Sequence, residues 1–116
     1  MPADPAPDFD LDDARARCQH LFHDMVEFFF AEADVLLGQI RAAADKGEAA
    51  EVARLAHRLK GSVAYLGAAP ATETCAQLEE LGRAGPSAEM DALVGELGPR
   101  IERLQAALAP HRKPPA

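Results

Sequence analysis

Apolar residues recur at steps of three and four along most of the chain, the spacing that places them on one face of an α-helix. The clearest stripe precedes Gly47 and consists of Phe22, Val26, Phe29, Ala33, Leu36, Leu37 and Ile40. The strict alternation of apolar and polar residues that is typical of a half-buried β-strand is missing from the sequence. The pattern therefore predicts an all-α protein.

Turn-forming residues divide this pattern into separate helices. A first helical segment is predicted from about residue 10 or 12 toward residue 23, and a break before the long helix that follows stays open. Gly47 and Gly67 are placed as helix stops. Pro70 can open the next helix, because the first helical turn does not need the N–H that proline lacks. A further turn is predicted over residues 82–86, and Ser87 is predicted to cap the last helix.

The later helices carry apolar stripes of their own. In the third helix, predicted over residues 48–66, the stripe is Val52, Leu55, Ala56, Leu59, Val63 and Leu66. In the fourth it is Ala71, Cys75, Leu78 and Leu81. The last helix has a heptad-like seam of Met90, Val94, Leu97, Ile101, Leu104 and Leu108, within which Pro99 is expected to kink the helix or remove a bond to Gly95. Four such helices with short connections predict an antiparallel up-down-up-down four-helix bundle with an additional short N-terminal helical segment.

Length and composition set the boundaries of this bundle. A chain of 116 residues suffices for one domain. The bundle is expected over residues 11–109, between a proline- and aspartate-rich flexible tail at residues 1–10 and a flexible tail at residues 110–116.

Charge and cysteine content narrow the function classes. A net charge of -7 argues against nucleic acid or an anionic membrane as the main partner. The sequence shows neither a membrane-spanning apolar run nor a signal-peptide pattern. Cys18 and Cys75 fit neither a zinc site nor a disulfide framework, so free thiols and a cytoplasmic location are expected.

One histidine of the third helix lies off its apolar stripe. On a helical wheel His57 falls at roughly 140° from Val52, whereas the stripe spans roughly 300° through 0° to 40°. An exposed histidine is common and needs no function. Two features argue for a function here. Gly61 should lower the stability of the helix by about 1 kcal/mol relative to alanine, and it leaves the surface beside His57 low. The ammonium of Lys60 is a suitable point charge for a phosphate. The neighbours of His57 one turn away are Ala53, Arg54, Lys60, Gly61 and Ala64.

The chemistry that fits these residues is phosphoryl transfer to an imidazole nitrogen. A neutral imidazole is a nucleophile near neutral pH, and Lys60 could neutralise part of the phosphoryl charge. The sequence has no glycine-rich phosphate loop and no acidic magnesium cluster beside His57, so we expect no ATP site, no cofactor and no metal. The donor and acceptor machinery would come from a partner.

Residues 56–62, AHRLKGS, followed by YLGA at 65–68, resemble the histidine-containing phosphotransfer (HPt) domain family. The resemblance covers about residues 20–108. It implies that His57 is the phospho-acceptor, that Lys60 supports the phosphoryl group, that Gly61 admits a receiver domain and that Ser62 has a secondary role. One departure is Gly47-Glu48, where family members often have Gly-Asp.

The resemblance also implies the partners of the chain. It would relay a phosphoryl group between receiver-domain aspartates in a multistep two-component phosphorelay, with the aspartate and magnesium supplied by the receiver. The partners would be a response-regulator receiver domain and a hybrid histidine kinase, with no small-molecule substrate. Without kinase or receiver sequences of its own, the chain is expected to be a stand-alone module. The residues expected to contact a partner are Arg54, Arg58, Ala64 and Phe28.

Other interpretations of the sequence stay open. Phe28 and Phe30 flank the stripe residue Phe29, and either partial burial or an exposed patch for the receiver would account for them. The chain could also be a helical adaptor or dimerisation bundle in which His57 is idle and the last helix binds a partner chain, or an HPt-like domain that binds receivers without accepting phosphate. A metal site is disfavoured because its candidate ligands share one helical region: His20, His23, Asp24 and Glu27.

Overall fold

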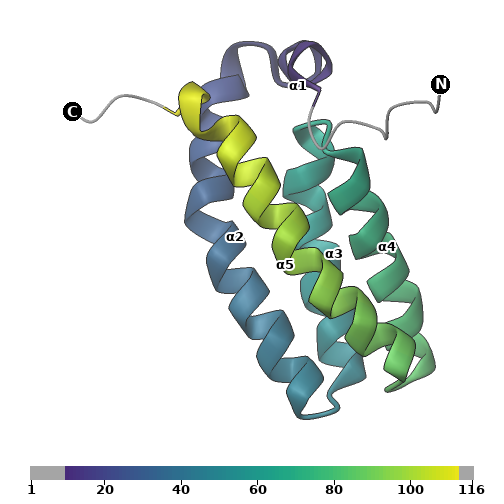
Figure 1. The fold of residues 1–116 in the computed structure, drawn as a ribbon. Helices are drawn as coiled ribbons and strands as arrows, with labels where there is room; N and C mark the ends of the chain where they lie inside the picture. The colour runs from purple at the N-terminus through teal and green to yellow at the C-terminus, as the bar shows by residue number, and fades with distance from the viewer. Residues whose placement is uncertain (1–9, 113–116) are drawn as a thin grey trace, which may run out of the picture.

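Four long helices run up and down in the computed structural model, which describes residues 10–112 without the side chains of residues 18 and 19 (Figure 1). They are α2 (Phe22–Asp45), α3 (Ala49–Tyr65), α4 (Ala69–Ala84) and α5 (Ala88–Leu108). All regular structure within the described range is helical, so the predicted all-α four-helix bundle is confirmed. None of the described helices combines the length and apolar character needed to cross a bilayer.

The predicted N-terminal helical segment is a separate helix, α1 (Leu11–Cys18). A short 3-10 turn, η1 (Gln19–Leu21), divides it from α2 and thereby answers the question that the sequence left open. The backbone N–H of Asp13 donates to Oδ1 of Asp10 at 3.0 Å, as at a capped helix start. The helix lies at the upper end of the bundle in Figure 1, and its Ala14 is buried in the common core.

Glycines end α2 and α3 in the same way. Gly47 has φ +70° and Gly67 has φ +68°, a left-handed conformation that side chains with a Cβ rarely adopt. After α3, the N–H groups of Gly67 and Ala68 donate to the carbonyls of Ala64 and Val63 at 3.1 and 3.0 Å. This is the Schellman pattern, and it turns the chain sharply enough to start α4 two residues later.

The core is formed by the predicted stripes. The seam of α5 is buried inside this single chain, so it serves the intramolecular core and is not a free surface for a partner helix. Ser87 caps α5 as predicted, since its hydroxyl accepts from the N–H of Met90 at 3.1 Å. The helix continues through Pro99, which has no N–H to donate to Gly95.

The closest helix approach that bears on the site is between α3 and α4. A Cβ added to Gly82 would lie 2.6 Å from the carbonyl oxygen of Ala49 and 2.8 Å from Cβ of Ala53. Only a glycine therefore fits on α4 at this point. Ala53, a neighbour of His57 outside the apolar stripe of the third helix, is buried here, because α3 packs a second face against α4 that a single stripe does not reveal.

The C-terminal end of the described chain packs on α2. After α5, the 3-10 turn η2 (Ala109–His111) brings the carbonyl of His111 to 2.8 Å from Nδ1 of His23. Arg112 pairs with Glu27 at 3.2 Å and lies 4.2 Å from the ring centroid of Phe30. Residues 110–112, assigned to a tail from sequence, thus contact the bundle, while residues 1–9 and 113–116 lie outside the described chain.

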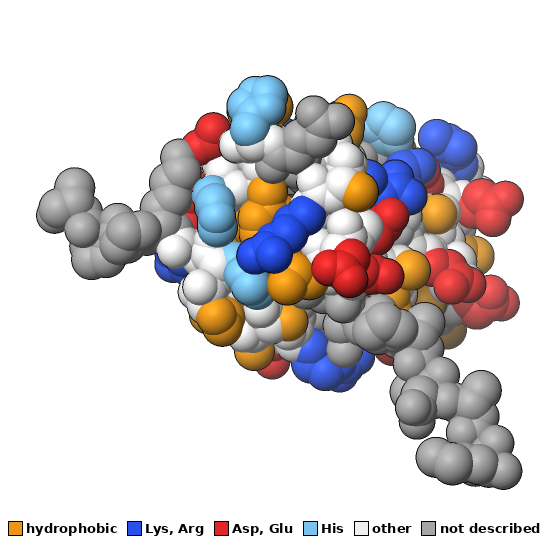
Figure 2. All heavy atoms as spheres, turned by 90° about the horizontal axis from the view of Figure 1, so that it is seen from above, with side chains coloured by type: hydrophobic (Ala, Val, Ile, Leu, Met, Phe, Trp, Pro, Cys, Tyr) orange, Lys and Arg blue, Asp and Glu red, His pale blue; other side chains and the backbone are white. Residues whose placement is uncertain are grey.

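Histidine side chains gather at this end of the bundle, as Figure 2 shows from above. Within residues 10–112, no group of three or more His, Cys, Asp or Glu side chains is arranged to hold a metal ion. The cluster near the start of α2 is instead linked to the C-terminal turn through His23 and Glu27.

Candidate functional site

His57 lies on α3 at the edge of its contact with α4, with 70% of its side chain exposed. Its Nδ1 is hydrogen-bonded to Oε1 of Glu79 on α4. An ionised carboxylate can only accept, so Nδ1 must carry the ring proton. In the neutral ring the other nitrogen, Nε2, then keeps its lone pair, and this tautomer presents its nucleophilic nitrogen away from Glu79.

Glu79 is a buried acid with two partners. The residue is only 5% exposed, and its second carboxylate oxygen accepts from Nζ of Lys60 at 2.6 Å. Burial alone would raise the pKa of Glu79. The hydrogen bonds from Lys60 and His57, together with their charges, outweigh burial and hold this pKa below its ordinary value. Glu79 is therefore ionised at neutral pH, as the proton assignment on His57 requires.

Lys60 is bound to Glu79 but retains donors for another group. Its side chain is half-buried, and an ammonium has three N–H donors. One of them is directed at Glu79. The remaining two can meet an anion that approaches His57 from solvent.

Gly61 has open space where a side chain would begin. A Cβ built on this residue would meet no heavy atom within 4 Å. Packing within the chain therefore does not require a glycine here. The result is a low surface one helical turn from His57.

The other residues singled out from sequence are spread around α3. Ser62 is buried, about 140° around the helix from His57, so its expected secondary role would be exerted from within the bundle. Arg58 lies 3.7 Å from Glu32 of α2. Ala64 lines a groove between α1, α3 and α4. Phe28 is 51% exposed on α2, which favours the exposed-patch interpretation over burial.

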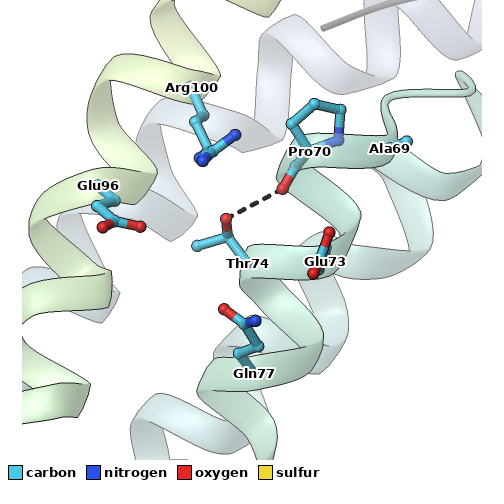
Figure 3. A pocket seen from close by; sticks show the side chains of 7 residues that line it. All are labelled: Ala69, Pro70, Glu73, Thr74, Gln77, Glu96 and Arg100. Atoms are coloured by element: carbon cyan, nitrogen blue, oxygen red, sulfur yellow. Dashed lines mark hydrogen bonds between the residues drawn. The ribbon is translucent and has the colours of Figure 1, made fainter. Parts of the chain in front are cut away.

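Two surface depressions differ in their relation to His57. The first lies beside it and is lined by Ala50, Ala53, Arg54, His57, Gly82 and Arg83. The second lies between α4 and α5, where Arg100 and Glu96 face α4 and the hydroxyl of Thr74 donates to the carbonyl of Pro70 (Figure 3). His57, Lys60 and Glu79 all lie outside this second depression.

Glu79 is the site residue that sequence reasoning missed. It lies four residues after Cys75 and eight after Ala71, both on the apolar stripe of α4. A charged residue that is buried needs a polar partner. The stripe position of Glu79 was therefore the feature of the sequence that could have indicated such a partner. Burial and the charge of Glu79, only partly offset by Lys60, also raise the pKa of the Cys75 thiol to about 12, so this thiol is not a nucleophile of the site.

Comparisons with known proteins identify the family and the fold of the chain. A sequence model of the Hpt domain family matches residues 24–109. The crystal structure of histidine-containing phosphotransfer protein B (HptB) from Pseudomonas aeruginosa PAO1 superposes with a TM-score of 0.81 at 22% sequence identity. That match covers 93% of this chain and 96% of the other. A search of curated protein sequences gives no match.

Proposed function

The chain belongs to the Hpt domain family, and we propose that it relays a phosphoryl group between receiver-domain aspartates through Nε2 of His57. The observation that carries the proposal is the bond from Nδ1 of His57 to Glu79. In the neutral ring this bond keeps the proton on the inner nitrogen, so that the outer nitrogen carries the lone pair. An oriented and exposed nucleophile is what phosphoryl transfer to a carrier protein requires.

The phosphoryl transfer step needs no added base, because Nε2 attacks without losing a proton. Nε2 attacks the phosphorus of a receiver phosphoaspartate, a bond from Nε2 to phosphorus forms, and the bond from phosphorus to the aspartate oxygen breaks. The aspartate leaves as a carboxylate. The ring keeps its proton on Nδ1 and gains positive charge, which the carboxylate of Glu79 stabilises. The reverse sequence of bonds passes the group to a second receiver.

The phosphoryl group would meet Lys60 on the protein side. Two N–H donors of this ammonium stay available after its bond to Glu79. We propose that the receiver supplies its own aspartate and magnesium, so that the complete transfer site forms only in the complex. In this scheme the chain is a phosphoryl carrier and the receiver contributes the catalytic machinery.

A receiver would dock on the surface where α2 borders α3. Phe28 and Val35 are 51% and 56% exposed and lie two turns apart on α2. Between them Glu32 pairs with Arg58 of α3. This mixed apolar and charged surface continues toward Gly61, where the chain is open to close approach. The two expected occupants are the receiver of a hybrid histidine kinase and that of a response regulator.

Transfer of label from a phosphorylated receiver tests the proposal. Wild-type protein and a His57→Gln variant are mixed with each phosphorylated receiver domain of the source organism. Acid-labile, base-stable label on the wild type alone supports the relay and locates its residue. Absence of label from every receiver would overturn it, and binding without label would favour a receiver-binding adaptor.

A further inference from the structure

The depression beside His57 contains two arginines that the relay as described does not use. Arg54 comes from α3, one turn before His57, and Arg83 comes from α4, one turn after Glu79. Small residues form the remaining lining: Ala50, Ala53 and Gly82. The volume of about 540 Å³ leaves room for a phosphoryl group attached to the ring.

The cationic side chains around His57 differ in whether their N–H donors are already bonded within the chain. Nζ of Lys60 is bound to the buried carboxylate of Glu79 at 2.6 Å. Nε of Arg54 is bound to Glu51, also at 2.6 Å. Within residues 10–112, Arg83 forms no ion pair or hydrogen bond through its side chain. Among the cations that line this depression, Arg83 is therefore the one whose donors are all available to an incoming anion.

The packing of α4 against α3 fixes the backbone position of Arg83. Its neighbour Gly82 touches α3 so closely that an added Cβ would clash with Ala49 and Ala53. The backbone of residue 83 is thus held beside α3, and its exposed side chain can reach over the depression. A guanidinium presents paired N–H donors that match phosphate oxygens.

We propose that Arg83, with Arg54 beside it, binds the oxygens of the phosphoryl group on His57 in this depression. Lys60, held by Glu79, contributes its two remaining donors, and Arg83 adds a guanidinium whose donors are all available. This inference rests on the proposed phosphorylation of His57. It adds a second cationic side chain, on α4, that binds the phosphoryl oxygens beside Lys60 before any receiver contributes.

Phosphorylation by phosphoramidate tests this without a receiver. In this reaction the bond from phosphorus to nitrogen of the donor breaks, a bond from phosphorus to Nε2 of His57 forms, and ammonia leaves. Rates are measured over a range of phosphoramidate concentrations for wild type, Arg83→Gln, Arg83→Lys and Arg100→Gln. Arg100 is a matched control because it lines the depression of Figure 3 on the other side of α4.

The expected result is a rate for Arg83→Gln that is about three- to tenfold lower at low donor concentration, partial recovery in Arg83→Lys and no change in Arg100→Gln. The phosphohistidine of Arg83→Gln should also hydrolyse at a different rate from that of the wild type. Thermal unfolding checks that the exposed substitution leaves the fold intact. If wild type is labelled and Arg83→Gln matches it in both rates, the inference is overturned and the relay stands. If wild type takes label neither from phosphoramidate nor from any receiver, both this inference and the proposed relay are overturned.

Discussion

His57 and Glu79 are hydrogen-bonded across the α3–α4 contact although 22 residues separate them in the sequence. The same carboxylate also binds Lys60, so one buried acid on α4 positions both polar side chains that α3 contributes. The site is therefore a property of the packed helix pair. Neither helix alone carries it.

Replacing Glu79 by glutamine should slow phosphorylation of His57 by about ten- to hundredfold. Glutamine has one acceptor oxygen for two donors, and it has no charge to stabilise the ring as the bond to phosphorus forms. Label uptake from phosphoramidate measures the effect. The adjacent Glu80→Gln variant is the control, because Glu80 is exposed on the same helix. Equal rates for the two variants would show that Glu79 has no positioning role.

The stability of the protein should depend on the ionisation of Glu79. Its pKa is lower in the folded state than its ordinary value of 4.5, so the ionised group stabilises the fold above that value. This contribution is lost as the pH falls from 4.5 through the folded-state pKa. Urea unfolding of wild type and Glu79→Gln at several pH values should show their free energies of unfolding converging on the acid side. Parallel pH profiles of the two proteins would contradict a stabilising ionisation of Glu79 in the folded state.

Gly61→Ala should separate stability from docking. Alanine fits the open helix surface and should raise the free energy of unfolding by about 0.5–1 kcal/mol. Its methyl group would also hold a receiver away from His57. We expect slower transfer from a phosphorylated receiver and an unchanged rate from phosphoramidate.

Gly95→Ala on α5 is the control for this experiment, since a Cβ there also meets nothing within 4 Å. It should raise stability to a similar extent and leave both transfer rates unchanged. A Gly61→Ala variant with normal receiver transfer would show that the glycine does not serve close approach.

Cys75 should be unreactive in the folded protein. Burial raises the pKa of its thiol to about 12, so almost no thiolate forms at moderate pH, and the side chain is inaccessible. In a Cys18→Ser background, a thiolate-specific reagent such as DTNB should label Cys75 only when urea unfolds the chain. Rapid labelling without urea would contradict the closed packing of α4 on α3.

The bundle could be predicted from sequence because its information is local. Stripes at helical spacing, the two glycine stops and the serine cap each act within a few residues, and the structure places them as expected. His57 could be singled out for the same reason: its departure from the stripe and its neighbours Lys60 and Gly61 lie on one helix.

Contacts between helices could not be predicted in the same way. Glu79 and Glu80 are adjacent acids, and only the packing of α4 decides that the first is buried against His57 and the second faces solvent. The burial of Ala53 could not be predicted, because it depends on a glycine that lies 29 positions further on, at Gly82. The position of the exposed Arg83 beside His57 likewise depends on how α4 packs against α3.

The glycine contact between α3 and α4 also sets the distance that Glu79 must span to reach its partners. The side chains of Glu79, His57 and Lys60 reach one another because the helix backbones touch at Gly82. A partner that wedged the two helices apart would break both bonds of Glu79 together, freeing the ring proton and the ammonium in one movement. The spacing of the two helices at Gly82 is therefore as much a part of the site as the three side chains that it brings together.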